Sequence, residues 1–360
     1  MAIERQSFGS IQAGRGVAAL LVVLFHASAK VFAKSDYWDT TILGGFFNFG
    51  HAGVDFFFVL SGFIIAHVHA ADIGAPARLA NFVRSRLLRI YPVYWFILIG
   101  VIALSLLPFG LNSSVHLTPQ MVISAFVLVG PVDSPTVLAV AWTLFHEIAF
   151  YIAFGIAIAS PRAGIVVAGA WVAGILASAL GYPFLPPYLG DSINLLFLFG
   201  VGIWWLSKHH PQTLPIVLAW VGTAGFLALG MENVFAPVFS YAARHLLFGA
   251  ASALIIGALV AQEGRRPIKV SPVLLTLGAA SYSIYLTHFP VLGFVAKAHA
   301  IAAVRALPVA LAFVLVVALT VLAGVAFHFL VEKPLTRATG RWWPRGGARS
   351  GSGATPLGRP

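Results

Sequence analysis

The sequence predicts an all-α integral membrane protein with about ten transmembrane helices, and three observations support this fold class. Hydrophobic residues make up 59% of the 360 residues and charged residues only 9%, whereas a soluble domain carries roughly 25% charged residues. The mean hydropathy is +0.92. Apolar runs close to the roughly 20 residues that a bilayer requires recur along the chain. Because lipid cannot satisfy open backbone groups, each run is expected to be a helix.

The apolar runs divide the chain into one long membrane domain and a short tail. A transmembrane helix is expected at each of these runs: 16–33, 46–70, 92–110, 121–159, 164–181, 192–207, 214–231, 243–261, 273–296 and 307–331. Residues 121–130 are too short to cross alone, so they count as a partly embedded lead-in to the fourth span. We expect a transmembrane domain over 1–336. Residues 337–360, which are basic and rich in Gly and Pro, are expected to be a disordered cytoplasmic tail.

The distribution of Lys and Arg orients these helices. With the N-terminus in the cytoplasm, most of these residues fall on the cytoplasmic side: Arg5, Arg15, Arg78, Arg84, Arg86, Arg89, Arg162, Lys208, Arg265, Arg266, Lys269, Lys333 and the arginines of the tail. The opposite side holds only Lys30, Lys34, Arg244, Lys297 and Arg305. Cytoplasmic loops carry the excess of positive charge, so both termini are expected in the cytoplasm. The same rule explains the net charge of +11, and no nucleic-acid partner is expected.

The first span, GRGVAALLVVLFH at residues 14–26, carries an arginine at one end and a histidine at the other. Arg15 and His26 lie on one helix face, about 16 Å apart along the axis, because eleven residues make three turns plus about 20°. Arg15 is explained equally well as a residue that reaches the cytoplasmic interface. His26 lies beyond the midplane, where an ionisable group usually faces a cavity or a partner. A neutral, hydrogen-bonded core histidine is the alternative.

Polar groups on three other spans fall at the depth of His26. Helical spacing puts His51 with Asp55 on one face of the second span, and Thr143, Glu147 and Tyr151 on one face of the fourth. Ser281, Tyr285 and His288 share a face of the ninth. The expected layer in the outer half of the membrane consists of His26, Asp55, Glu147 and His288. Two carboxylates and two histidines in a dry cavity suit general acid–base chemistry, and they suit a proton relay equally well.

A second cluster, RSRLLRIYP at residues 84–92, lies on the cytoplasmic side between two spans. Arg84, Arg86 and Arg89 fall within six positions, and Pro92 is expected to begin the next helix. The positive-inside rule accounts for such a cluster without any ligand. Guanidinium groups also bind phosphate oxygens in a bidentate manner, which predicts a phosphate site. A long ligand with phosphates at one end, such as acyl-CoA, could then point its reactive end toward His26.

These segments together resemble the membrane-bound acyltransferase-3 proteins, which are bacterial O-acyltransferases. The similarity covers about residues 8–335 and six motifs in order. The motif residues are Arg15 and His26; Asp55, Ser61 and Gly62; Arg86, Arg89 and Pro92; Trp142, Leu144 and Glu147; Ser281, Tyr282, Tyr285, Leu286 and His288; and Glu332 with Pro334. The short form of the chain is most similar to the exopolysaccharide O-acetyltransferases.

The resemblance implies that the domain over 1–336 is an acyltransferase of the cytoplasmic (inner) membrane, with several crossings and no bound cofactor. It implies that acetyl-CoA or another short acyl-CoA is the donor on the cytoplasmic side, and that a hydroxyl of a surface or exported polysaccharide or lipid-linked oligosaccharide is the acceptor. His26 is the expected base. The expected donor-binding residues are Arg15, Arg84, Arg86 and Arg89, and the expected substrate-binding residues are Trp142, Ser281 and Tyr285.

The expected reaction begins with His26, which accepts the hydroxyl proton through Nε2 or Nδ1 while the oxygen attacks the thioester. Glu147 or Asp55 would orient the imidazole, as the acid of a catalytic triad does. His288 would bind the acceptor or stabilise the oxyanion. A two-step route through an acyl-histidine, or through an acyl-serine at Ser61 or Ser281, is also open.

Two other functions fit parts of the pattern. A proton-coupled transporter needs buried carboxylates and histidines, but the sequence shows no inverted repeats and a transporter has no need of the arginine cluster. A haem protein could use His26 and His288, but a second histidine pair is missing and charged neighbours disfavour it. The chain has no cysteine, which excludes thiolate metal sites, and the adjacent His209 and His210 support no metal site either.

Overall fold

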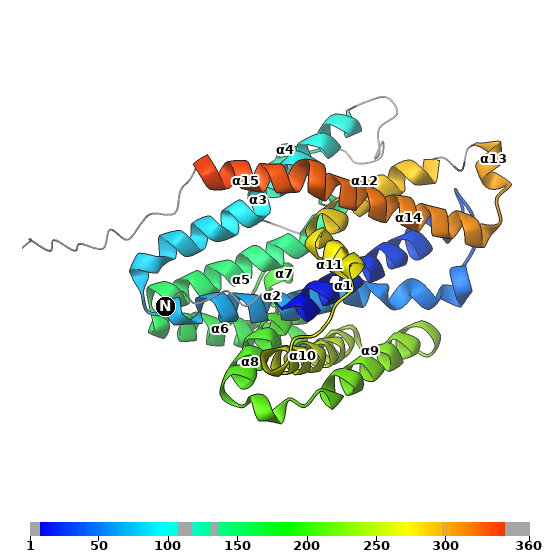
Figure 1. The fold of residues 1–360 in the computed structure, drawn as a ribbon. Coiled ribbons are helices and arrows are strands. Elements are labelled where there is room, and N and C mark those ends of the chain that lie inside the picture. The colour runs from blue at the N-terminus through cyan, green and yellow to red at the C-terminus, as the bar shows by residue number, and fades with distance from the viewer. Residues whose placement is uncertain (1–7, 107–116, 131–135, 298, 300, 343–360) are drawn as a thin grey trace, which may run out of the picture.

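A computed structural model of the protein describes residues 8–106, 117–130, 136–297, 299 and 301–342. This described part is a bundle of helices and contains no strand, which confirms the all-α prediction. Figure 1 shows α1 and α2 in the middle, with α8, α9 and α10 on one side and α14 and α15 on the other. The site described below lies among the helices that surround α1 and α2.

The helices follow one another with short 3₁₀ and π segments between them. The α-helices of the described residues are α1 (Gly9–His26), α2 (Gly53–His69), α3 (Leu79–Ser105), α4 (Pro119–Val127), α5 (Trp142–Ala159), α6 (Pro161–Ala179), α7 (Pro187–Gly190), α8 (Leu195–His209), α9 (Val217–Phe235), α10 (Tyr241–Arg265), α11 (Pro272–Ala279), α12 (Ser281–Lys297), α13 (Ala302–Arg305), α14 (Val309–Phe327) and α15 (Lys333–Trp342). The 3₁₀ segment η2 (Ile42–Ala52) leads into α2, and η5 (Ala139–Ala141) leads into α5.

Eight helical segments in the described residues are long and apolar enough to cross a membrane, which agrees with an integral membrane protein. The two other predicted spans correspond to α8, with 15 residues, and α12, with 17 residues. At about 1.5 Å per residue both are shorter than a hydrocarbon core of about 30 Å. The count of ten and the cytoplasmic position of both termini therefore stay predictions.

The structure corrects the predicted start of the third span. Pro92 does not begin a helix, because α3 runs without a break from Leu79 to Ser105 and contains Pro92 in its interior. A membrane helix tolerates such a proline where neighbouring helices and polar side chains satisfy the freed backbone groups. The arginine cluster therefore lies on a helix rather than in a connection. Arg86 and Arg89, three residues apart, share a face, whereas Arg84 lies on another.

Two further boundaries differ from those expected. The ninth predicted span is divided at Ala280 into α11 and α12, which puts Ser281 at the buried start of α12. The predicted tail begins inside α15, which continues to Trp342; its residues from 343 onward lie outside the described residues.

Helix α2 is held against α8 by a contact between backbones. A Cβ atom at Gly62 would lie 2.0 Å from the carbonyl oxygen of Phe197, and one at Gly200 would lie 1.9 Å from that of Val59. Only glycine permits this approach, as at many helix crossings in membranes. The contact fixes the rotation of α2, on which Asp55 points to His245 of α10 and Ser61 points to Glu147 of α5.

Two π-helical segments interrupt the long helices next to polar groups. Residues Ala27–Phe32 continue α1 directly after His26, and His328–Glu332 continue α14. Such segments are rare and occur frequently at functional sites. Here they set the direction of His26 and of Glu332.

Candidate active site

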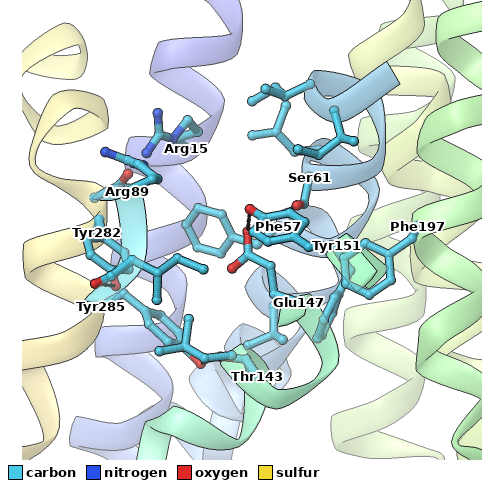
Figure 2. Close-up of a pocket in the computed structure, with 18 of the residues that line it drawn as sticks. Arg15, Phe57, Ser61, Arg89, Thr143, Glu147, Tyr151, Phe197, Tyr282 and Tyr285 are labelled. Carbon is cyan, nitrogen blue, oxygen red and sulfur yellow. Dashed lines mark hydrogen bonds between the residues drawn. The ribbon is translucent and has the colours of Figure 1, made fainter. Parts of the chain in front are cut away.

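Among the cavities of the described part of the bundle, two are lined by several polar side chains, and the first of these is lined by arginines. This arginine cavity has a volume of about 230 Å³. Its polar lining consists of Arg15, Ser61, Arg86, Arg89, Thr143, Glu147, Tyr151, Ser281, Tyr282 and Tyr285. Figure 2 shows Arg15 and Arg89 at one end of the cavity, with the Glu147 carboxylate deeper inside. The structure thus brings together groups from α1, α2, α3, α5 and α12.

Three of the four arginines expected to serve the donor line this cavity. Arg15 comes from α1, and Arg86 and Arg89 come from α3. Arg84 is not among the lining residues, because it projects from a different face of α3. The predicted set of four is therefore reduced to three at this site.

A buried polar network fixes Arg89. Its Nη1 lies 3.5 Å from Oε1 of Glu332, which is 4% exposed. The other carboxylate oxygen of Glu332 accepts from Ser283 Oγ at 2.6 Å and lies 2.7 Å from Nδ1 of His328. The guanidinium of Arg89 also lies over the ring of Tyr282, 5.2 Å from its centroid. Glu332 therefore holds Arg89 from behind, away from the cavity.

The positive charges in this cavity exceed the negative ones. Glu147 is the only acid that lines it, against three arginines, and Glu332 approaches one of these from outside. Within the described part of the chain, no carboxylate lies within salt-bridge distance of Arg15. A cavity with this balance suits a ligand with several negative charges, such as phosphates.

Glu147 lies on the arginine side and does not contact His26. Its Oε1 accepts hydrogen bonds from Ser61 Oγ at 3.2 Å and from the hydroxyl of Tyr151. Contrary to the prediction, Glu147 therefore does not orient His26 in this structure. Helical spacing gave the correct face of α5, because Thr143, Glu147 and Tyr151 all line the arginine cavity.

The second cavity is lined by histidines and has a volume of about 350 Å³. Its polar lining consists of His26, His51, Trp142, Tyr241, Arg244, His245 and Tyr285. These residues come from α1, η2, α5, α10 and α12. We call it the histidine cavity.

The hydrogen bonds of His26 and His288 assign the proton positions on both rings. His288 Nδ1 lies 2.6 Å from the carbonyl oxygen of Tyr285, and His26 Nδ1 lies 3.0 Å from that of Val22. A carbonyl only accepts, so both Nδ1 atoms carry hydrogen in the neutral rings. His26 Nδ1 also lies 3.3 Å from His288 Nε2, which is then free to accept. The arrangement leaves Nε2 of His26 unprotonated in a residue that lines the cavity.

His288 and Asp55 are both completely buried and line neither cavity. His288 lies behind His26, so it cannot contact an acceptor as predicted; it contacts the base instead. Asp55 does not orient His26. Its Oδ1 lies 2.6 Å from Nδ1 of His245 on α10. The carboxylate expected to support His26 thus supports a different histidine.

Sequence reasoning missed His245. It lies in the eighth predicted span, in the run YAARHLLFGA, and an ionisable residue inside a span is a signal for function. The sequence could therefore have pointed to His245 as a functional residue. It could not have identified Asp55 as the partner, because the pairing depends on how α10 packs against α2.

The two cavities are neighbours, because Tyr285 and Val54 line both of them. The hydroxyl of Tyr285 lies 3.1 Å from Thr143 Oγ1 and donates to the carbonyl oxygen of Val140 at 3.3 Å. Of the other expected substrate-binding residues, Trp142 lines the histidine cavity and Ser281 lines the arginine cavity. Tyr285 is therefore the polar residue that the two linings share.

The described residues contain no group of three or more His, Asp or Glu side chains arranged to hold a metal ion. The polar groups of both cavities are instead arranged as hydrogen-bonding and ion-pairing groups. They can bind an anion, accept a proton and donate a hydrogen bond to an oxygen.

Comparisons with known proteins identify the family of the chain. Exopolysaccharide production protein ExoZ of Rhizobium meliloti (strain 1021) is 30% identical over 335 residues, which cover 88% of this chain and 95% of that protein. Acyltransferase MdmB of Streptomyces mycarofaciens is 29% identical over 374 residues, which cover 92% of each. No solved structure matches the chain. The family described as an acyltransferase domain matches residues 8–329. The protein therefore belongs to the acyltransferase-3 family of membrane-embedded acyltransferases.

Proposed function

We propose that the protein is an O-acyltransferase of the cytoplasmic membrane that transfers an acetyl or other short acyl group from acyl-CoA to a hydroxyl of a surface or exported polysaccharide. One observation carries the proposal: a cavity with three arginines shares the wall residue Tyr285 with a cavity that presents the unprotonated Nε2 of His26. The acyl donor, bound by the arginines, and the base His26 can thus act on the acceptor hydroxyl from two sides.

The arginine cavity is the proposed donor site. Arg15, Arg86 and Arg89 offer guanidinium groups that can pair with the phosphates of CoA. The predicted orientation puts the ends of α1 and α3 that carry these arginines on the cytoplasmic side, where acyl-CoA is made. The thioester on its long arm would then reach Tyr285.

The histidine cavity is the proposed place of proton transfer. His26 Nε2 accepts the proton of the acceptor hydroxyl while the hydroxyl oxygen forms a bond to the thioester carbon. The carbon–sulfur bond breaks, and the CoA thiolate takes the proton from His26, which returns to its neutral form. The hydroxyl of Tyr285 has one hydrogen, which would leave the Val140 carbonyl and be donated to the carbonyl oxygen that gains negative charge. Direct transfer of this kind needs no acyl-enzyme.

A polysaccharide acceptor is supported by the name of one relative. The Rhizobium protein is named for exopolysaccharide production, and it aligns with nearly the full length of this chain. The Streptomyces relative is named only as an acyltransferase, which supports the reaction type rather than the acceptor.

The experiment that tests this function measures ester-linked acetate on the purified surface polysaccharide of the producing strain. A deletion strain is complemented with wild type, His26→Ala or Arg89→Ala, with membrane levels matched by immunoblot. His209→Ala and Arg162→Ala serve as controls, because these exposed residues line neither cavity.

We expect the deletion to abolish the acetate and His26→Ala to lower transfer by about 100-fold or more, the usual contribution of a general base. We expect Arg89→Ala to lower it as well, with partial recovery in membrane vesicles at high acetyl-CoA concentration. Unchanged acetate in the deletion strain would rule out this acceptor, and full transfer by His26→Ala would rule out His26 as the base.

A further inference from the structure

His245, which lines the histidine cavity, pairs with a carboxylate behind it, and the proposed reaction does not use this pair. Asp55 on α2 is completely buried, and its Oδ1 lies 2.6 Å from Nδ1 of His245 on α10. The carboxylate accepts this hydrogen bond, so Nδ1 of a neutral His245 carries the hydrogen and Nε2 keeps its lone pair. Nε2 makes no hydrogen bond with a described residue, and His245 lines the cavity. Asp55 therefore fixes His245 as a hydrogen-bond acceptor.

One other residue in the same lining, His51, has an unpartnered N–H group. The amide nitrogen of Asn233 donates to His51 Nε2 at 3.4 Å, which leaves the hydrogen on Nδ1. His51 Nδ1 is buried without a hydrogen-bond partner among the described residues, whereas Arg244 Nε lies opposite the carboxylate of Glu232. A buried donor without a partner is costly, so a ligand or water that pairs with it is favoured.

The resulting set of groups matches hydroxyls better than any charged group. His26 and His245 each offer an accepting nitrogen, and His51 offers a donating one. A carboxylate ligand needs donors alone, and an ammonium ligand needs acceptors alone. Neighbouring hydroxyl groups both donate and accept, so they can pair with the whole set.

The charges of this cavity are balanced within the protein. Asp55 faces His245, and Arg244 Nε lies 3.6 Å from Oε2 of Glu232. The arginine cavity, in contrast, has three arginines and one lining acid. The histidine cavity therefore offers hydrogen bonds without an excess of positive charge to attract an anion.

We propose that the histidine cavity is the acceptor subsite and takes an uncharged, hydroxyl-rich sugar unit, which His245 binds through Nε2 and Asp55 positions. This proposal rests on the proposed function and adds the class of acceptor. Trp142 and Tyr241 contribute aromatic surface to the same lining, as is usual in sites for small polar molecules.

The test uses inside-out membrane vesicles that contain the native acceptor and receive radiolabelled acetyl-CoA. Transfer is measured as alkali-labile label in polysaccharide, and donor binding is measured with labelled CoA on the purified protein.

The variants are Asp55→Asn and His245→Gln. The side-chain amide introduced by Asp55→Asn can donate to Nδ1 of His245, which moves the ring hydrogen to Nε2 and removes the acceptor. Asp72→Asn is the matched control, because Asp72 also pairs with a histidine, His69 at 2.9 Å, but lines neither cavity.

We expect Asp55→Asn and His245→Gln each to lower transfer by about tenfold or more, the effect of a buried hydrogen bond lost, with donor binding as in wild type. Asp72→Asn should transfer as wild type does. Mapping of the ester by mass spectrometry should place it on an uncharged sugar.

Three results would overturn the inference while wild type still transfers: normal transfer by both variants, loss of donor binding in both variants, or an ester on a uronic acid. The failure of wild type to transfer any label from acetyl-CoA would instead refute the proposed function. The two failures are therefore distinguishable.

Discussion

Nε2 of His288 lies 3.3 Å from Nδ1 of His26, so the partner of the proposed base is a second histidine. His288 is itself held by the carbonyl oxygen of Tyr285 at 2.6 Å and is completely buried. This chain of hydrogen bonds fixes the tautomer of His26 without a carboxylate. A catalytic triad uses an acid at this position, and here backbone carbonyls and a neutral ring stand in its place.

The first prediction concerns His288. His288→Phe keeps a ring in the buried space but removes the nitrogen that accepts from His26. His26 Nδ1 still donates to the carbonyl oxygen of Val22, so the tautomer of His26 is kept. We therefore expect kcat to fall by about tenfold, which corresponds to the loss of one hydrogen bond. This loss is smaller than the one expected for His26→Ala. The measurement is the rate of acetyl transfer in vesicles at saturating acetyl-CoA. A loss equal to that of His26→Ala would contradict a positioning role.

The second prediction concerns Glu332. Glu332→Gln removes the charge that holds Arg89 at 3.5 Å, so the guanidinium loses its fixed position at the donor cavity. We expect the KM for acetyl-CoA to rise by about tenfold, in line with a hydrogen bond to a charged group, while kcat stays near that of wild type.

The control for Glu332→Gln is Asp36→Asn, which breaks the exposed ion pair with Lys34 at 2.8 Å. Exposed ion pairs contribute little to stability, so we expect Asp36→Asn to leave the KM for acetyl-CoA unchanged. A fall in kcat with an unchanged KM would mean that Glu332 acts on the chemical step instead of on donor binding.

The third prediction concerns Tyr285, which lines both cavities. Tyr285→Phe removes the hydroxyl that can stabilise the developing oxyanion, but Thr143 keeps its own bond to the Val140 carbonyl at 3.1 Å. We expect kcat to fall by about 100-fold or more, as when one oxyanion donor is lost, with donor affinity unchanged.

Tyr94→Phe is the matched control for Tyr285→Phe. Tyr94 is also buried and donates to a carbonyl oxygen, that of Ala125 at 2.7 Å, but it lines neither cavity. Equal losses of activity in both variants would indicate a general effect of removing a buried hydroxyl.

Local periodicity was enough to predict several parts of the site. The spacing of Arg15 and His26 on one face of α1 puts one in each cavity, as the structure does. Composition and apolar runs were likewise sufficient for the all-helical membrane fold. These properties depend only on residues within one helix, where the geometry is fixed by 3.6 residues per turn.

The rest depended on contacts between helices. The pairing of Asp55 with His245 joins residues that are 190 positions apart, and no periodicity within α2 or α10 reveals it. The depth of Glu147 depends on where α5 begins after η5, and Arg86 and Arg89 face the cavity only because α3 continues through Pro92. Element boundaries and tertiary pairing are where a single sequence is least informative.

The last prediction concerns stability and tests the crossing of α2 and α8. Alanine replaces glycine favourably inside an unhindered helix, by about 0.5–1 kcal/mol. At Gly100 a Cβ atom would meet no atom within 4 Å, so Gly100→Ala should raise the thermal unfolding midpoint of the purified protein slightly.

At Gly62 the same methyl group would lie 2.0 Å from the Phe197 carbonyl oxygen, which is backbone and cannot rotate away. The helices must then separate, and overpacking of this kind typically costs about 1–3 kcal/mol. Gly62→Ala should therefore lower the midpoint while Gly100→Ala does not. Because α2 carries both Ser61 and Asp55, the same variant should also lose transfer activity under conditions in which it remains folded. Equal midpoints for the two variants would mean that α2 and α8 do not approach as closely as this geometry requires.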